Sequence, residues 1–230
     1  VYLTMEKLKN NLQCNPEWYK DRLFHFTSSE LYKLLSEPRE KAKKESGELS
    51  ETSKSYVYDK ISEYITNGTC LDYKELNTRE VAWGKELEIS ARHAYEKKKS
   101  VIVDDCGFFE FNDYFGGSPD GLVGQDGFIE IKCPFNTSIH VKHLRLKDEN
   151  DLKKEHYEYY VQIQGNFIAT GRKWCDFISY DPRCQSELFA LKIIRVLPDH
   201  EFIETCIKKL DKANKYKEKV MDEIINLQCA

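Results

Sequence analysis

The sequence has no excess of positive charge. Its 230 residues contain 35 Lys and Arg against 39 Asp and Glu, a formal net charge of −4. A protein that coats nucleic acid passively carries a broad positive field, so the composition argues against that class. An enzyme that gathers carboxylates can still bind nucleic acid through a local basic groove. Residues 140–154 are the best stretch for such a groove, although a solvated helix face explains them equally well.

Long apolar runs, a signal peptide and paired cysteines are also missing. The eight cysteines include no C-x-x-C pair and no matching histidine pair, which excludes the common zinc-site patterns. They are not clustered either, which argues against an iron–sulfur centre. We therefore expect reduced, mostly buried thiols in a cytoplasmic protein with no membrane span.

Aromatic residues are plentiful, with 14 Tyr, 12 Phe and 3 Trp, so the chain can build a substantial core. We expect residues 1–230 to form one domain. Residues 37–55 are almost devoid of apolar side chains, which predicts a mobile charged loop. Residues 201–228 carry apolar side chains at helical spacing, which predicts an amphipathic C-terminal helix.

Periodicity gives the remaining elements. Helices are predicted over 56–67, 78–98 and 155–170, and a helix preceded by a proline-containing turn over 15–35. Strands are predicted over 100–103, 107–114, 128–133, 174–180 and 187–196. This order predicts an α/β fold with a mixed central sheet flanked by helices.

The most informative stretch is 116–134, GGSPDGLVGQDGFIEIKCP. Asp120 lies on a Pro-Asp-Gly turn at the mouth of a predicted hairpin. On the returning strand Glu130 and Lys132 are two residues apart, so their side chains share a face, while Ile129 and Ile131 point into the core.

Two carboxylates and a lysine in this arrangement suit phosphodiester hydrolysis. Asp120 and Glu130 can hold one or two divalent cations, and hard oxygen ligands favour Mg²⁺ or Mn²⁺. Lys132 can orient or deprotonate the attacking water, its pKa lowered by an adjacent cation. Alternating charge is also ordinary on a half-exposed strand, so it is the turn that places Asp120 opposite Glu130 that favours a site.

Two helices add polar residues on apolar faces. Glu88 lies on one stripe with Ala91, Arg92 and Tyr95, as a metal ligand or as the partner of Arg92 in a surface salt bridge. Gln164 interrupts the apolar stripe of 157–168. Its buried amide forms either a core hydrogen bond or a contact with the catalytic lysine or a phosphate.

Together these motifs resemble the PD-(D/E)xK nuclease superfamily, whose core hairpin corresponds to Pro119-Asp120 and Glu130-Ile131-Lys132. More narrowly, the chain resembles the bacteriophage lambda exonuclease group, the YqaJ-type viral recombinase family. The resemblance runs from about Trp18 to the C-terminal helix. The matching stretches, in chain order, are Trp83-Gly84-Lys85 with Glu88 and Ala91-Arg92, Ser118-Pro119-Asp120-Gly121-Leu122, Glu130-Ile131-Lys132-Cys133-Pro134-Phe135, Val161-Gln162-Ile163-Gln164 and Tyr180-Asp181-Pro182-Arg183.

The resemblance implies a restriction-endonuclease-like core and a set of metal ligands. Asp120 and Glu130, with the backbone carbonyl of Ile131, would hold the first Mg²⁺ ion. Asp120 with Glu88 would hold the second, so that each active site takes two ions, and Mn²⁺ would substitute.

The resemblance also implies roles outside the metal ligands. Lys132 would position the nucleophilic water, with Gln164 close by. Arg22, Ser29 and Ser118 would clasp a terminal 5′-phosphate, for which a guanidinium and hydroxyls are suitable groups. Relatives usually carry a glycine just after the Arg22 position, whereas this chain has Phe24-His25-Phe26.

The implied activity is a Mg²⁺-dependent 5′→3′ exonuclease of double-stranded DNA. It would leave 3′ single-stranded overhangs for phage-type recombination by strand annealing. The implied partners are duplex DNA ends, two further copies in a homotrimer and a single-strand annealing protein, with the gene in a phage or prophage. Two alternatives remain: an endonuclease or flap nuclease on the same core, and an inactive DNA-end-binding or partner-docking module.

Overall fold

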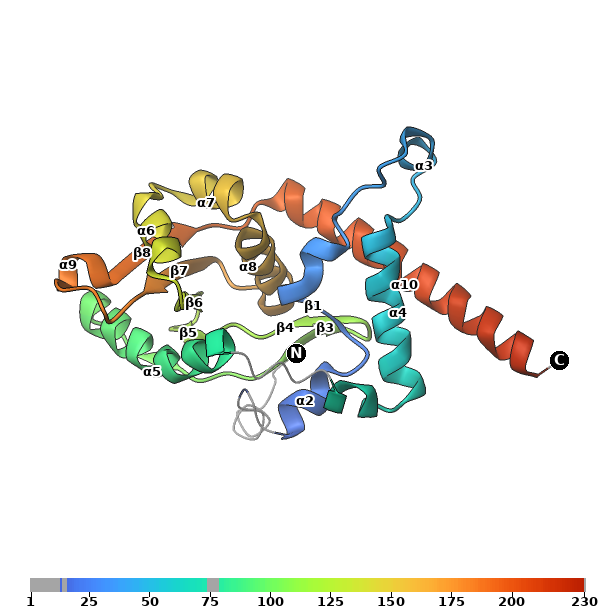
Figure 1. Cartoon of the computed structure of the whole chain (residues 1–230), viewed down its shortest axis with the longest axis horizontal. Coiled ribbons are helices and arrows are strands. Elements are labelled where there is room, and N and C mark those ends of the chain that lie inside the picture. The colour runs from blue at the N-terminus through green and yellow to red at the C-terminus, as the bar shows by residue number, and fades with distance from the viewer. Residues whose placement is uncertain (1–12, 14–15, 74–78, 230) are drawn as a thin grey trace.

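The chain forms two sheets and a set of helices that cover them (Figure 1). The computed structural model describes residues 13, 16–73 and 79–229. The α-helices are α2 Pro16–Arg22, α3 Lys41–Glu45, α4 Glu51–Ile65, α5 Arg79–Lys99, α6 Thr137–Arg145, α7 Glu149–Glu155, α8 Tyr157–Thr170, α9 Glu187–Ala190 and α10 His200–Gln228, with 3₁₀ helices η1 Ser28–Lys33 and η2 Thr69–Tyr73.

Eight strands are described. They are β1 Phe26–Thr27, β2 Val103–Asp104, β3 Phe109–Asn112, β4 Phe115–Gly117, β5 Gly121–Val123, β6 Gly127–Lys132, β7 Trp174–Tyr180 and β8 Leu191–Val196. One sheet has the order β2-β5-β6-β7-β8, with β6 and β7 parallel and the other pairs antiparallel. The other has the order β1-β4-β3. The predicted mixed sheet flanked by helices is confirmed.

Helices pack on both faces of the five-stranded sheet. Phe128 and Phe177 lie in one core cluster with residues of α8. Ile129 and Ile131 lie in another with Ala91 of α5. The alternation predicted for β6 is therefore confirmed: successive side chains enter two different cores. A third cluster joins η1, α4, α8 and α10, and α10 runs beside α4 (Figure 1).

Residues 37–55, predicted as a mobile charged loop, contain helices and buried side chains. The segment contains α3 and the first turn of α4, and Ser50 and Ser53 are buried at 5% and 0% exposure. Ser50 caps α4 by accepting the Ser53 N–H, and Ser53 donates to the Lys33 carbonyl. Small hydroxyl side chains can be buried when hydrogen bonds satisfy them, which apolar content alone does not reveal.

Several other boundaries differ from the prediction. Residues 187–196 begin as α9, capped by Ser186, and only 191–196 form a strand. The helix predicted over 15–35 is instead two shorter helices, α2 and η1, which are separated by strand β1. The predicted C-terminal helix is confirmed by α10.

The stretch 140–154 is not a continuous basic surface. His140 and His143 on α6 are fully buried, and the Nδ1 atoms of both lie 2.7 Å from the Ser179 hydroxyl. Only part of this run, such as Lys142, faces water.

Two observations concern the other compositional predictions. The seven cysteines in the described part of the chain are free thiols, of which Cys106, Cys175 and Cys206 are buried. None of the described helices combines the length and apolarity needed to cross a bilayer.

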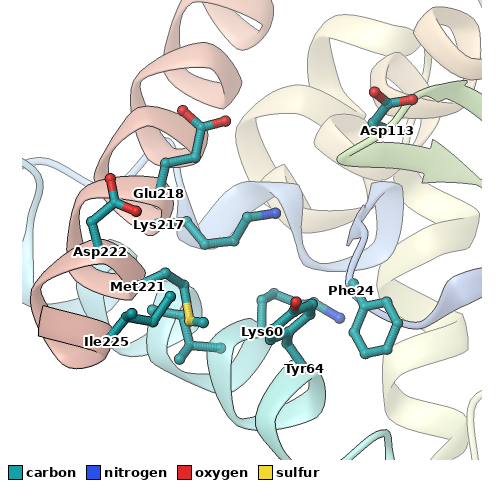
Figure 2. A pocket seen from close by; sticks show the side chains of 10 residues that line it. Phe24, Lys60, Tyr64, Asp113, Lys217, Glu218, Met221, Asp222 and Ile225 are labelled. Carbon is teal, nitrogen blue, oxygen red and sulfur yellow. The ribbon is translucent and has the colours of Figure 1, made fainter. Parts of the chain in front are cut away.

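A cavity of about 430 Å³ opens between α4 and α10. Tyr64, Met221 and Ile225 give it apolar walls, and Lys60 and Lys217 extend into the same region (Figure 2). None of the predicted catalytic or metal-binding residues lines this cavity.

Candidate active site

The β5–β6 hairpin places Asp120 directly against Glu130 and its neighbours. The Asp120 N–H donates to the Ile129 carbonyl at 3.1 Å, which extends the ladder one residue before β5. The Asp120 carboxylate turns back onto β6, where its Oδ2 accepts the Ile131 N–H at 2.6 Å. The main chain of Ile131 therefore lies against the Asp120 carboxylate.

Glu130 and Lys132 extend from β6 toward α8. Glu130 is 0% exposed, and its Oε1 accepts a hydrogen bond from Lys132 Nζ at 2.7 Å. Lys132 Nζ also donates to Gln162 Oε1 at 3.2 Å and lies 5.1 Å from the ring centre of Tyr159. Asn166 Nδ2 donates to the other oxygen of Glu130, Oε2, at 3.2 Å.

The expectation that Gln164 lies beside Lys132 is wrong. Gln164 Nε2 donates to the Leu197 carbonyl, and its Oε1 accepts the Asp199 N–H, both at 2.9 Å. Residues two apart on a helix point in roughly opposite directions, so Gln164 holds the turn after β8 while Gln162 meets the lysine. The alternative of a core hydrogen bond is the one observed for Gln164.

Three residues on α8 escaped the sequence-based prediction. Tyr159, Gln162 and Asn166 have the spacing i, i+3, i+7, which places them on one face of the helix. Polar groups repeating at that spacing in an otherwise apolar helix were the available signal. Gln164 also interrupts the apolar pattern of this helix, and the sequence alone does not show which of these polar residues faces the site.

Burial and neighbouring negative charge disfavour the ionised forms of the carboxyl groups at the site. Burial, together with the nearby charge of Asp120, raises the pKa of Glu130 to about 8. Burial also raises the pKa of Asp120 above its usual range. Burial and then the charge of Asp120 raise the pKa of Glu88 on α5 to about 7. Carboxyls in this state gain from a neighbouring cation.

The Lys132 ammonium group supplies positive charge next to these carboxyl groups. Burial lowers its pKa, but the charges of Glu130 and Asp120 outweigh burial, and the pKa lies above the ordinary value. Lys132 is therefore a charged hydrogen-bond donor in this structure.

The donor set fits a hard divalent cation. Glu88, Asp120 and Glu130 outnumber the single lysine among them, and carboxylate oxygens are the ligands that Mg²⁺ and Mn²⁺ prefer. Within the described residues, no three His, Cys, Asp or Glu side chains are already gathered around one point. Both oxygens of Glu130 and Oδ2 of Asp120 accept hydrogen bonds in this structure, from Lys132, Asn166 and the Ile131 N–H.

Arg92 supports the hairpin. It forms an ion pair with Asp105, and its Nη2 donates to the Asp120 carbonyl at 3.0 Å. The salt bridge considered for Glu88 and Arg92 thus gives way to contacts of Arg92 with Asp105 and Asp120. Arg92 therefore fixes the main chain at Asp120.

The predicted phosphate-binding residues are brought together in part. Arg22 Nη1 donates to Ser118 Oγ at 3.4 Å, and Trp18 Nε1 donates to the same oxygen at 2.9 Å. The Arg22 guanidinium lies 4.2 Å from the ring centre of Trp18. Ser29 is exposed on η1, with its Oγ 3.2 Å from that of Thr27. Arg22 and Ser118 therefore meet two residues from Asp120.

Phe24 has a backbone conformation that is usual for glycine. Its φ is 69°, in the left-handed region that glycine adopts without strain. The Phe24 N–H donates to Glu63 Oε2 at 3.1 Å, and Glu63 is held by a buried ion pair with Lys60 at 2.9 Å. The surrounding structure thus imposes the conformation on a residue that disfavours it.

Comparison with known proteins agrees with this geometry. The pattern that defines the YqaJ-like viral recombinase domain matches residues 17–173. The chain belongs to this family. No curated protein sequence matches the chain.

Two solved structures of the alkaline exonuclease LHK-Exo from Laribacter hongkongensis, one in complex with dAMP, are similar to this YqaJ-like domain. Each is 27% identical, with a TM-score of 0.78, over 94% of this chain and 98% of the other. A phage-related exonuclease from Haemophilus somnus 129PT shares the fold, with a TM-score of 0.65 at 21% identity over 87% of this chain and 96% of the other. The family and the LHK-Exo likeness support a nuclease.

Proposed function

We propose that this chain is a Mg²⁺-dependent 5′→3′ exonuclease of double-stranded DNA that leaves 3′ single-stranded overhangs. One observation carries the proposal. The hairpin that presents Asp120, Glu130 and Lys132 also carries Ser118, to which Arg22 donates. A hydrolytic group and an anion-binding group thus lie two residues apart in the chain.

The metal ligands follow from the oxygen donors at the hairpin. Asp120, Glu130 and the carbonyl of Ile131 hold one cation, and Asp120 with Glu88 holds the second. Mn²⁺ can replace Mg²⁺. The chemistry that the bound cations supply is polarisation of the phosphodiester and stabilisation of the attacking and leaving oxygens.

Lys132 orients the attacking water as a charged donor. Glu130 and Gln162 fix the ammonium from two sides, and the Tyr159 ring stabilises its charge.

Arg22, Ser29 and Ser118 bind the terminal 5′-phosphate. A guanidinium beside hydroxyls recognises a phosphate with charge-assisted hydrogen bonds. A terminal phosphate held there brings a phosphodiester near Asp120, which gives the 5′→3′ direction. The dAMP in the LHK-Exo complex belongs to the product class expected of this chain, a nucleoside monophosphate.

The biological role proposed is recombination. The family is described as a viral recombinase domain, and 3′ overhangs are the substrate of strand annealing. The proposal includes a homotrimer acting on duplex ends, a single-strand annealing protein as partner, and a phage or prophage gene expressed in the cell interior.

The test uses linear duplexes with 5′-phosphate or 5′-hydroxyl ends, each labelled at the 3′ end, in Mg²⁺ and in EDTA. We expect digestion in Mg²⁺ only, faster from 5′-phosphate ends, with the 3′ label retained on progressively shorter strands. Closed circular duplex should be untouched. Cleavage of the circle would favour the endonuclease alternative, and DNA binding without hydrolysis in Mg²⁺ or Mn²⁺ would favour the inactive end-binding module.

A further inference from the structure

Asn166 is a buried amide that contacts a proposed metal ligand directly. It lies on α8, is 0% exposed, and donates from Nδ2 to Glu130 Oε2 at 3.2 Å. Lys132 bonds the other oxygen of the same carboxyl at 2.7 Å. Both oxygens of Glu130 therefore have a donor, one from its own strand and one from the helix above it.

The orientation of the Asn166 amide is fixed by its surroundings. With the amide reversed, its oxygen would face the Glu130 carboxyl oxygen and lose the hydrogen bond. On the other side, a Cβ added at Gly117 would lie 2.4 Å from Asn166 Oδ1, so the side chain fits only because residue 117 is glycine. The amide is wedged between the end of β4 and the middle of β6.

Asn166 Oδ1 has no hydrogen-bond partner in the part of the chain that the structure describes. Burying an unpaired acceptor costs free energy, which an apolar residue of the same size would avoid. The contact with Glu130 is the gain that offsets this cost. A role in helix packing alone does not account for an amide at this position.

We propose that Asn166 is a positioning residue that fixes the Glu130 carboxylate for metal binding. This inference rests on the proposed function, in which Glu130 is a ligand. By holding Oε2, Asn166 sets the plane of the carboxylate and, through it, the place of Lys132. Hydrogen bonds to metal-binding carboxylates orient them and commonly raise metal affinity by about 10–100-fold.

Gln164 provides a matched control. It is also a fully buried amide on α8, but it bonds the Leu197 carbonyl and the Asp199 N–H, away from Glu130. Loss of the Gln164 amide should lower thermal stability, because it removes the hydrogen bonds to the Leu197 carbonyl and the Asp199 N–H. Only loss of the Asn166 amide should change metal binding.

The experiment compares Asn166→Leu, Gln164→Leu and wild type by calorimetric titration with Mn²⁺ and by the Mg²⁺ dependence of DNA cleavage. Asn166→Ala, which removes the donor without added bulk, is measured alongside in case the leucine disturbs folding. For Asn166→Leu and Asn166→Ala we expect Mn²⁺ affinity to fall about tenfold or more and the Mg²⁺ concentration for half-maximal rate to rise to match, with KM for DNA unchanged. Gln164→Leu should lower Tm and keep wild-type metal affinity.

Two results would overturn the inference, and they differ. If wild type binds Mn²⁺ and the folded Asn166 variants bind it within twofold of wild type, only the role of Asn166 fails. If wild type itself takes up no Mn²⁺, the proposed function fails as well.

Discussion

At the scale of single residues, hydrogen bonds within the protein hold the side chains of the site in place. Lys132 is held by Glu130 and Gln162, and Asp120 by the Ile131 N–H. The hairpin trio could be predicted because a strand repeats every two residues and a Pro-Asp-Gly sequence marks its turn. The residue of α8 that binds Lys132 could not be predicted in this way. Gln162 and Gln164 are both amides in one helix, and which faces the site depends on how α8 packs.

Exchange of Gln162 tests that correction. In Gln162→Leu, Lys132 loses one of its two hydrogen-bond acceptors at the site, so we expect kcat for DNA cleavage to fall about tenfold with Tm nearly unchanged. The measurements are steady-state kinetics on linear duplex and thermal unfolding. An unchanged kcat would show that Glu130 alone suffices to hold the lysine.

The buried pair Lys60–Glu63 supports the loop behind Arg22. Its side chains are 6% and 8% exposed, and Glu63 also accepts the Phe24 N–H. Glu63→Ala should lower the free energy of unfolding by about 3–5 kcal/mol, because it leaves an uncompensated buried ammonium. It should also weaken the preference for 5′-phosphate ends.

The pair Lys54–Glu51 on the same helix is the control for that variant. Both pairs are spaced i, i+3, but Glu51 is 82% exposed. Glu51→Ala should change the free energy of unfolding far less than Glu63→Ala does, because water screens an exposed pair. Equal losses in the two variants, measured by chemical denaturation, would contradict the role given to burial.

At the scale of elements, the predictions succeeded where one face of a segment is apolar. β6 and α10 carry clear periodicities, and both were predicted. The segment 37–55 was not, because Ser50 and Ser53 are buried through bonds to each other and to the Lys33 carbonyl. Such bonds join residues distant in sequence, and local composition does not show them.

The packing of α6 on β7 has a consequence for acid stability. His143 is fully buried, and burial, followed by the charges of His156, His140 and Lys132, lowers its pKa to about 3. Below about pH 6.5 the unfolded chain takes up a proton that the folded protein does not bind until about pH 3. The contribution of His143 is therefore complete above pH 6.5 and is lost as the pH falls.

Replacement of His143 by Gln should remove this dependence. We expect the difference in unfolding free energy between wild type and His143→Gln to shift by about 1–2 kcal/mol in favour of the variant from pH 7 to pH 5. Urea denaturation at the two pH values measures it, with the exposed His93→Gln as control. A difference that stays the same at both values would contradict a neutral buried His143.

At the scale of the whole molecule, the fold and the family could be predicted because several motifs occur in order along the chain. Residues 17–173 match the family, and LHK-Exo aligns over 94% of the chain. Direction, end preference and trimer formation remain proposals, because they depend on DNA and on contacts between copies. A single chain contains the side chains proposed for these properties, such as Arg22 beside Ser118. The properties themselves depend on the DNA and on the other copies that these side chains contact.

The central claim is that Asp120 belongs to a metal-dependent hydrolytic site. It is tested most directly by digestion of a 5′-phosphorylated linear duplex in Mg²⁺ by wild type, Asp120→Asn and Asp126→Asn. Asp126 is the matched control, because it lies on the turn of the same hairpin in a solvent-exposed pair with Lys173. We predict wild-type rates for Asp126→Asn and a loss of about a hundredfold or more for a folded Asp120→Asn. Digestion by Asp120→Asn at the wild-type rate would contradict the account.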